Sequence, residues 1–359
     1  MSRTDRAQTS IESYFRTKVH KDPRIHNAYL LVHSDKLDIH MKLAEGVTAG
    51  QKAHADQPYF IASVGKLFTS VLIGILVEKG LLAYEDLITQ YLDADLLQGL
   101  HVYKDRDYIN TIQIRHLLNH TSGLPCYFED QPKQAKSILT LILDEPNRIW
   151  SQRELLDFSK AHLQARFEPG KGFHYSDTGY NLLGQIIEKI TDRRHPEALR
   201  HYIFEPLGMN QSCLIDEEPI VQSKYPRAGV YIGDKNVVDY PSLGFDYAGG
   251  GIVSTSEELL LFMRALVHGE LVSLGTIERM KADKARFFLG IDYGYGLMQF
   301  KAVPLFMPRK FEMWGNAGAT GSFMFYHPAL DTYIIGNLNQ FRYHRHGLRI
   351  VFHTIGKLS

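Results

Sequence analysis

Alternating, strand-like segments occur only near the two ends of this 359-residue chain, and that distribution constrains its fold most. The segments are residues 28–32, 37–43, 311–315, 322–327 and 332–338. Each alternates apolar and polar side chains or forms a short apolar run, which is typical of strands in a partly buried sheet. We therefore predict one antiparallel sheet assembled from both ends of the chain.

The chain between those segments is dominated by helical periodicity. Candidate helices cover residues 63–79, 114–118, 137–143, 152–165, 179–190 and 196–203. Further helices are expected at the two termini, one starting at the Thr9-Ser10-Ile11-Glu12 capping box and one over 348–355. We expect an α/β part, about residues 1–60 plus 240–359, that encloses a mainly helical part, about 61–239, with a cleft between them.

Composition excludes several classes of function. Lys plus Arg and Asp plus Glu both number 40, so no basic excess points to nucleic acid or an anionic membrane. Only Cys126 and Cys213 are present, too few for a disulfide framework. No stretch is long and apolar enough to span a bilayer. The amino terminus lacks the apolar run of a secretory signal, so we expect a cytoplasmic protein, although a secreted chain trimmed of its signal would look the same.

Ser63 and Lys66 stand three residues apart at the start of a long apolar helical segment. Residues at i and i+3 share a helix face, so the Lys66 amine could reach the Ser63 oxygen. A serine hydroxyl is a poor nucleophile unless a nearby base takes its proton. The first N–H groups of a helix also suit a developing oxyanion. Ser63 is therefore the candidate nucleophile, although this spacing alone is common by chance.

Two later stretches, Tyr175-Ser176-Asp177 and Asn316-Ala317-Gly318, complete a three-element pattern with Ser63-Val64-Gly65-Lys66. This pattern resembles that of serine β-lactamases and penicillin-binding proteins. The closest similarity is to the branch of class C β-lactamases, DD-peptidases and esterases, in which a tyrosine begins the second element. Supporting stretches that look like family signatures are residues 117–125, 178–184, 206–209 and 248–255.

The resemblance implies a β-lactamase-like fold and specific roles for these residues. Ser63 would attack a carbonyl to form an acyl-enzyme, while Lys66 and Tyr175 share the proton transfers. The oxyanion hole would consist of the N–H groups of Ser63 and Ala319. Neither a metal nor an organic cofactor is implied. Gly318 would line the substrate site, and Trp314, just before the third element, could line the acyl pocket.

Two residues depart from the family pattern. The second element usually ends in Asn, but Asp177 when ionised only accepts hydrogen bonds and favours the ammonium form of Lys66. The third element usually begins with Lys or His, and Asn316 replaces that cationic donor with a neutral amide. Both changes are expected at the substrate site, and both disfavour substrates that carry a carboxylate.

The leading hypothesis is a serine hydrolase that acts on a small ester or amide, with esterase activity favoured. A peptidase for D-amino-acid peptides and a true class C-like β-lactamase remain alternatives within the same fold. A sensor or scaffold without turnover is a further alternative, although intact Ser63, Lys66 and Tyr175 argue against it. The sequence leaves the oligomeric state open.

Overall fold

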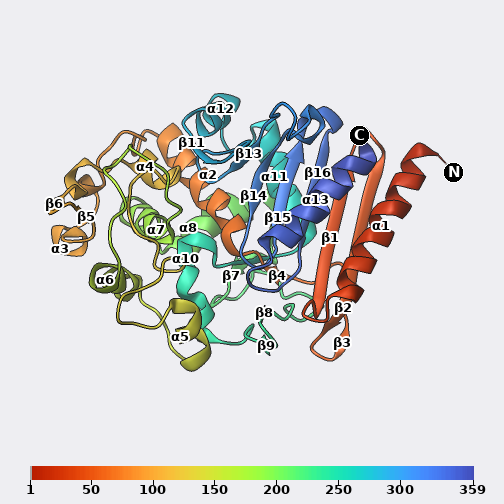
Figure 1. The fold of residues 1–359 in the computed structure, drawn as a ribbon, viewed down its shortest axis with the longest axis horizontal. Helices are drawn as coiled ribbons and strands as arrows, with labels where there is room; N and C mark the ends of the chain where they lie inside the picture. The colour runs from red at the N-terminus through yellow and green to blue at the C-terminus, as the bar shows by residue number, and fades with distance from the viewer. Residues whose placement is uncertain (1) are drawn as a thin grey trace.

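A computed structural model describes residues 2–359, and its central feature is a nine-stranded antiparallel sheet (Figure 1). Strand β1, from the start of the chain, pairs with β16 near its end, so the two ends form one sheet as predicted. In sheet order the strands are β11 (Ala285–Phe288), β12 (Ile291–Tyr293), β13 (Met298–Phe300), β14 (Met313–Ala317), β15 (Phe323–His327), β16 (Thr332–Asn337), β1 (Asn27–Ser34), β2 (Ile39–Thr48) and β3 (Gln51–Lys52).

The sheet is wider than the sequence predicted, because β11, β12 and β13 extend it beyond β14. These strands hold only three or four residues each and are interrupted by turns. Segments this short do not display the period of two that identifies a strand. The sequence therefore missed one edge of the sheet, while its five predicted strands are present.

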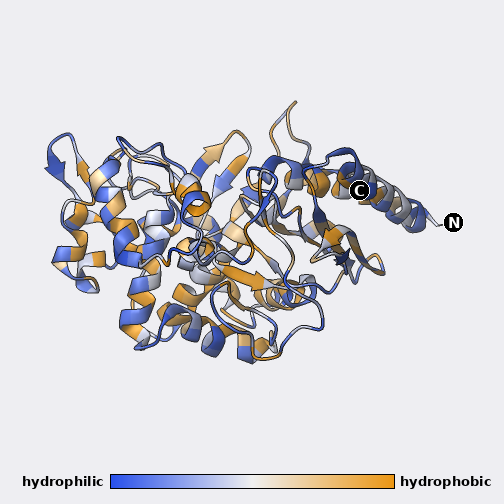
Figure 2. Cartoon of the chain, turned by 90° about the horizontal axis from the view of Figure 1, so that it is seen from below, coloured by the Kyte–Doolittle hydropathy of each residue, from blue (hydrophilic) through white to orange (hydrophobic). Residues whose placement is uncertain are grey.

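Helices α1 (Arg3–Lys21) and α13 (His344–Leu358) cover one face of the sheet side by side (Figure 1). The predicted start of the first helix at Thr9 is wrong. Ser2 caps α1 instead, because its side chain accepts from the Asp5 amide while the Asp5 carboxylate accepts from the Ser2 amide. The free end of α1, beside the N label, is coloured hydrophilic in Figure 2.

The opposite face of the sheet carries α2 (Gly65–Glu78) and α11 (Ser256–His268). Strand β1 is buried on both faces, since Tyr29 and Leu31 point to this side and Leu30 and Val32 to the side of α1. This burial explains why β1 reads as a continuous apolar run. No helix within residues 2–359 combines the length and apolar character of a membrane span.

The middle of the chain is mainly helical and packs against α2. Its helices, with those that follow, are α3 (Ala94–Leu97), α4 (Ile114–Leu118), α5 (Ile138–Asp144), α6 (Gln152–His162), α7 (Asp177–Thr191), α8 (His195–Leu199), α9 (Glu205–Leu207), α10 (Tyr247–Gly250) and α12 (Leu274–Ala282). Small strand groups accompany them: β4 (Tyr59–Phe60) with β10 (Ile252–Ser254) and β7 (Cys213–Leu214), β5 (Val102–Tyr103) with β6 (Arg106–Asp107), and β8 (Tyr231–Ile232) with β9 (Lys235–Asn236).

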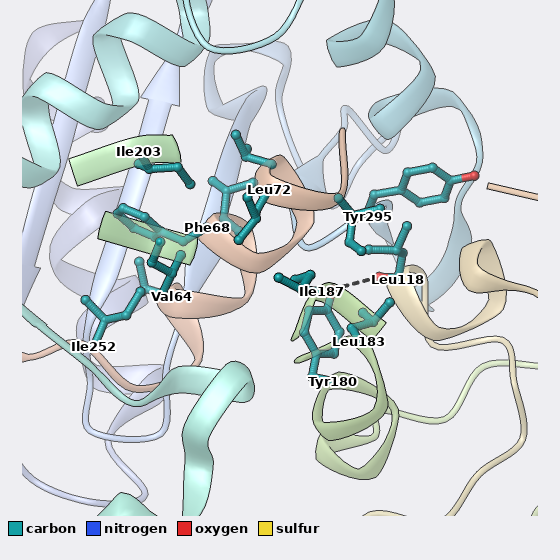
Figure 3. Packing of buried hydrophobic residues seen from close by; sticks show 14 of the residues in the cluster. Val64, Phe68, Leu72, Leu118, Tyr180, Leu183, Ile187, Ile203, Ile252 and Tyr295 are labelled. Carbon is teal, nitrogen blue, oxygen red and sulfur yellow. Dashed lines mark hydrogen bonds between the residues drawn. The ribbon is translucent and has the colours of Figure 1, made fainter. Parts of the chain in front are cut away.

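Helix α2 is the centre of the core, and every residue from Gly65 to Leu76 is buried. Figure 3 shows Phe68 and Leu72 of α2 packed in the same cluster as Tyr180 and Leu183 of α7. The Tyr180 hydroxyl donates to the Leu118 carbonyl at 2.9 Å, so it satisfies a polar group inside this apolar cluster. This packing holds the amino-terminal end of α2, which carries Lys66 and directly follows the turn that carries Ser63.

Candidate active site

Ser63 lies in the single turn η1 (Ala62–Val64), immediately before α2, and is half-buried. Ala62 has a φ of 47°, a conformation that costs a non-glycine residue roughly 1 kcal/mol or more. Gly250 makes this turn possible, because a Cβ on Gly250 would lie 2.6 Å from the Ala62 carbonyl carbon. The Gly249-Gly250-Gly251 run is therefore a close backbone contact against the turn that holds Ser63.

Lys66 stands one turn after Ser63, and its Nζ lies 3.4 Å from Ser63 Oγ. The same nitrogen donates to Asp177 through a short contact and to the Gly249 carbonyl at 2.6 Å. Lys66 is fully buried, so each of its three N–H groups has a protein partner. The predicted convergence of Ser63 and Lys66 is present, and Asp177 is part of the same group.

The charge of Lys66 is maintained by its neighbours. Burial opposes the ammonium form, but the Asp177 carboxylate contacts the amine and raises the pKa of Lys66 above the usual lysine value, and Asp246 acts in the same direction whenever it is ionised. An ammonium donates to Ser63 and cannot accept its proton. Lys66 therefore has to lose a proton before it can act as a base.

Tyr175 faces the same centre from the loop before α7. Its ring centroid lies 4.9 Å from Lys66 Nζ. Burial and the charge of Asp177 hold the pKa of Tyr175 well above its usual value, and the Ser63 side chain has the opposite effect. Tyr175 is thus a neutral phenol that can donate a proton, beside the predicted nucleophile.

His120 fixes the position of Tyr175, and sequence reasoning assigned it no role. Its ring lies 4.3 Å from the Tyr175 ring, and its Nδ1 accepts from the Ser176 amide at 3.1 Å. Burial and the charge of Lys66 hold the pKa of His120 well below its usual value, so the ring is neutral. The only available signal was the stretch Leu117–Pro125, which resembles a family signature without revealing a function.

The segments that carry the two predicted oxyanion-hole donors lie against each other. The end of β14 packs against the turn of Ser63, since a Cβ on Gly318 would lie 3.0 Å from the Ala62 Cβ and from the Ile61 carbonyl. Ser322 fastens the two segments by donating to the same Ile61 carbonyl at 2.7 Å. Ala319 follows Gly318 directly, so its N–H remains the candidate second donor beside Ser63.

The structure does not support a substrate contact from Asn316, because its amide is already used. Asn316 is 1% exposed, and its Nδ2 donates to the Gly296 carbonyl at 2.8 Å and to the Ser63 carbonyl at 3.2 Å. Its Oδ1 accepts from the Ala317 amide at 2.8 Å. Asn316 therefore supports the backbone behind Ser63. Strand residues alternate in direction, and the sequence did not reveal that this side chain points into the core.

Trp314 also lies outside the group around Ser63. Its ring is buried, with Lys281 Nζ 4.6 Å from its centroid and the Tyr326 ring edge-on at 6.0 Å. These neighbours come from α12 and β15, not from η1 or α7. The predicted contribution of Trp314 to an acyl pocket is therefore not supported by its position.

Further acidic groups that the sequence did not predict surround Lys66 and Asp177. Asp246 is buried, and burial raises its pKa well above the usual value. Glu129 is an exposed residue, yet partial desolvation of its carboxyl and the charge of Asp177 raise its pKa, while the charges of Lys66 and Arg342 lower it. The Cys126 thiol donates to Asp177 Oδ2 at 3.2 Å. The site is thus richer in carboxyl groups than its motifs indicate.

Comparisons with known proteins agree with this geometry. The family model described as Beta-lactamase matches residues 18–350. The chain is 31% identical to penicillin-binding protein 4* of Bacillus subtilis over 66% of its own length and 51% of that protein. It is 28% identical to penicillin-binding protein 4 of Amycolatopsis lactamdurans, covering 79% of this chain and 72% of the relative. The chain therefore spans about half the length of the Bacillus relative.

Two solved structures share the fold across nearly the whole chain. D-amino acid amidase from Ochrobactrum anthropi SV3, complexed with D-phenylalanine, has a TM-score of 0.78 at 21% identity, covering 98% of both chains. EstCE1, a hydrolase with promiscuous acyltransferase activity, also has a TM-score of 0.78, at 17% identity and 99% coverage of both chains. At these identities the likeness establishes the fold.

Proposed function

Because this chain belongs to the Beta-lactamase family, we propose that it is a serine hydrolase that forms an acyl-enzyme on Ser63 with a small ester or amide. One observation carries the proposal. Ser63 Oγ lies 3.4 Å from Lys66 Nζ at the start of α2, with the Tyr175 phenol against the same lysine. A nucleophile with two proton-transfer groups in reach is the arrangement that covalent catalysis by serine requires.

The reaction would proceed in two halves. Ser63 Oγ bonds to the acyl carbon, the developing oxyanion is stabilised by the N–H groups of Ser63 and Ala319, and the bond to the leaving group breaks. The serine proton passes through Lys66 and Tyr175 to the leaving group. Water then attacks the acyl carbon by the reverse proton path and releases the acid.

The charges around Ser63 favour substrates without a carboxylate. Asp177 and Glu129 are acidic groups of the site, and Asn316 supplies no cation because its side chain is a neutral amide, which is also buried. Of the two solved structures compared above, one is named as an amidase and the other as a hydrolase with acyltransferase activity. We therefore propose substrates without a carboxylate, namely neutral esters and amides together with amides of amino acids, whose ammonium group Glu129 could attract.

A second candidate function is hydrolysis of β-lactams or D-alanyl peptides, and Arg342 favours it. This exposed guanidinium is close enough to Glu129 to lower the pKa of that carboxyl. A substrate carboxylate could pair with Arg342 instead of a lysine in the third element. Two of the similar proteins are named penicillin-binding proteins.

One panel on one preparation tests both candidates. Intact-protein mass is measured after exposure to a fluorophosphonate, a penicillin and an aryl ester, and kcat/KM is measured for esters, amino-acid amides, penicillins and D-alanyl-D-alanine peptides. We expect a fluorophosphonate adduct on Ser63 and the highest kcat/KM for esters or amides. Preference for carboxylate-bearing substrates that Arg342→Ala abolishes would select the second candidate. Failure of every reagent to modify Ser63 would contradict the proposed function.

A further inference from the structure

Asp246 is a buried carboxyl beside the active centre that the mechanism above does not use. It ends the turn η5 (Pro241–Asp246), just before α10, and is 5% exposed. Its Oδ1 has no hydrogen-bond partner among the described residues. An unsatisfied carboxyl oxygen in the core is costly, so its position calls for a functional reason.

The geometry places Asp246 next to both Lys66 and Asp177. A Cβ on Gly249 would lie 3.2 Å from Asp177 Oδ1, 3.3 Å from Lys66 Nζ and closer still to Asp246 Oδ1. The tips of these three side chains therefore surround one point. The missing side chain of Gly249 is what lets them approach one another across α10.

The charges of this group balance only if one carboxyl is neutral. Lys66 supplies one ammonium, and its three N–H groups already go to Ser63, Asp177 and Gly249. A second carboxylate in this buried region would be an excess negative charge, which is strongly unfavourable. Burial raises the pKa of Asp246. The negative charges of Asp177 and Glu129 raise this pKa further, and the positive charge of Lys66 opposes these effects only in part. Asp246 is thus the carboxyl that carries a proton.

We propose that Asp246 is a positioning residue that holds a proton beside Lys66 and thereby sets how readily Lys66 can take the proton of Ser63. This inference rests on the proposed acyl transfer. In the first step an N–H proton of Lys66 moves to Asp177, which leaves a neutral amine and a carboxylic acid. The amine then accepts the Ser63 proton as Oγ bonds to the acyl carbon, and the negative charge passes to the substrate oxygen.

The proton on Asp246 makes the first step accessible. If Asp246 were ionised, its charge would stabilise the Lys66 ammonium, so Lys66 would give up a proton less readily. Acylation should therefore fall as the pH rises through the titration of Asp246. The other titratable groups facing this centre are Asp177, Glu129, Cys126, His120, Tyr127, Tyr175, Tyr180 and Tyr293.

The test is the pH profile of kcat/KM on an aryl ester for wild type and Asp246→Asn. Asn matches the shape of the protonated acid but cannot ionise, so we expect the alkaline limb to move up by about one pH unit or more. Glu258→Gln is the matched control, because Glu258 is a buried carboxyl of α11 that accepts from Ser212 Oγ at 2.6 Å, away from Lys66. The control should keep the wild-type profile.

A double substitution supplies a second readout. In Asp177→Asn, Asp246 can ionise and serve as the counter-ion of Lys66, whereas Asp177→Asn with Asp246→Asn leaves the lysine without a carboxylate. The two effects on kcat/KM should therefore be non-additive. An unchanged alkaline limb together with additive effects would overturn the proposal, because a purely structural role predicts both.

A titration of wild type decides the matter if Asp246→Asn does not fold. With ¹³C-labelled aspartate carboxyls, one buried carbon should keep the chemical shift of the protonated acid above neutral pH, whether or not a substrate is known. Ionisation of every aspartate below neutral pH would contradict the proposal. Lack of turnover with a protonated Asp246 would contradict only the acyl-transfer function.

Discussion

The second and third motif elements each carry one unusual residue, and the structure treats them differently. Asp177, at the start of α7, contacts Lys66 inside a buried group of titratable side chains that includes Asp246. The side-chain amide of Asn316, on β14, donates hydrogen bonds to the backbone carbonyls of Ser63 and Gly296. One departure changes the electrostatics of the reacting centre, and the other supports the backbone that carries the nucleophile.

The different contacts of Asp177 and Asn316 determine whether a substitution changes the charge of the reacting centre or the stability of the fold. Asp177, at the start of α7, contacts the Lys66 amine directly, so a change from amide to carboxylate at this position alters the charge state of the lysine. A strand side chain points alternately to the core and away from it, so a polar residue there can be entirely internal. Changes at Asp177 should therefore affect selectivity and pH dependence, and changes at Asn316 should affect stability.

The largest expected effect concerns the nucleophile that both elements surround. Ser63→Ala should lower the turnover rate by several orders of magnitude, and the residual catalysis would come from the oxyanion hole. Ser70→Ala is the matched control, because Ser70 lies two turns further along α2 and contacts Tyr180 Oη at 3.0 Å. Initial rates on the aryl ester decide the matter, and a Ser63→Ala enzyme with most of the wild-type rate would remove Ser63 from the mechanism.

The next effect isolates the phenol of the second element. Tyr175→Phe keeps the ring against His120 but removes the proton donor, so we expect kcat to fall by about 10²- to 10⁴-fold. Tyr180→Phe serves as the control, because that ring lies 5.3 Å from Lys66 while its hydroxyl donates to Leu118. Equal losses in the two variants would show that packing, not proton transfer, explains the effect.

The sequence predicted much of this arrangement because its signals are local. Ser63 and Lys66 are three residues apart, so helix geometry alone brings them together. The five predicted strands show either alternation or a short apolar run, and they lie in one sheet, as expected. Asp246 and Gly249 are far from Lys66 in sequence and reach it only through packing of α10 on α2, which no local pattern encodes. The direction of Asn316 depended on strand register in the same way.

A smaller effect sharpens the contrast at the second element. Asp177→Asn combined with Asp246→Asn removes the carboxylate that pairs with Lys66, so carboxylate-bearing substrates should gain about five- to thirty-fold relative to the aryl ester, equivalent to ~1–2 kcal/mol. Asp130→Asn is the control, because Asp130 pairs with His174 at 3.1 Å and Arg166 at 2.7 Å. The measurement is the ratio of kcat/KM values for a penicillin and the ester. An unmoved ratio would mean that the carboxylate paired with Lys66 does not influence substrate charge selection.

The smallest effect on activity is expected at the third element. Asn316→Ala leaves the buried carbonyls of Gly296 and Ser63 without their amide donor, which costs about 1–3 kcal/mol of folding free energy. We expect a lower Tm, a modest loss of kcat/KM and no change in the ratio between penicillin and ester. The matched control is Gln299→Ala. Gln299 lies on the neighbouring strand β13, and its side-chain amide donates to the Lys281 carbonyl at 2.8 Å.

Asn316→Lys separates the two interpretations of this position. If Asn316 faced the substrate, a lysine there would restore a cationic donor and favour penicillins. Because the side chain is buried, we expect instead an unpaired ammonium in the core and a larger fall in Tm than in Asn316→Ala. A stable Asn316→Lys enzyme with a higher penicillin-to-ester ratio would place this side chain in the substrate site after all, and the contrast with Asp177 would disappear.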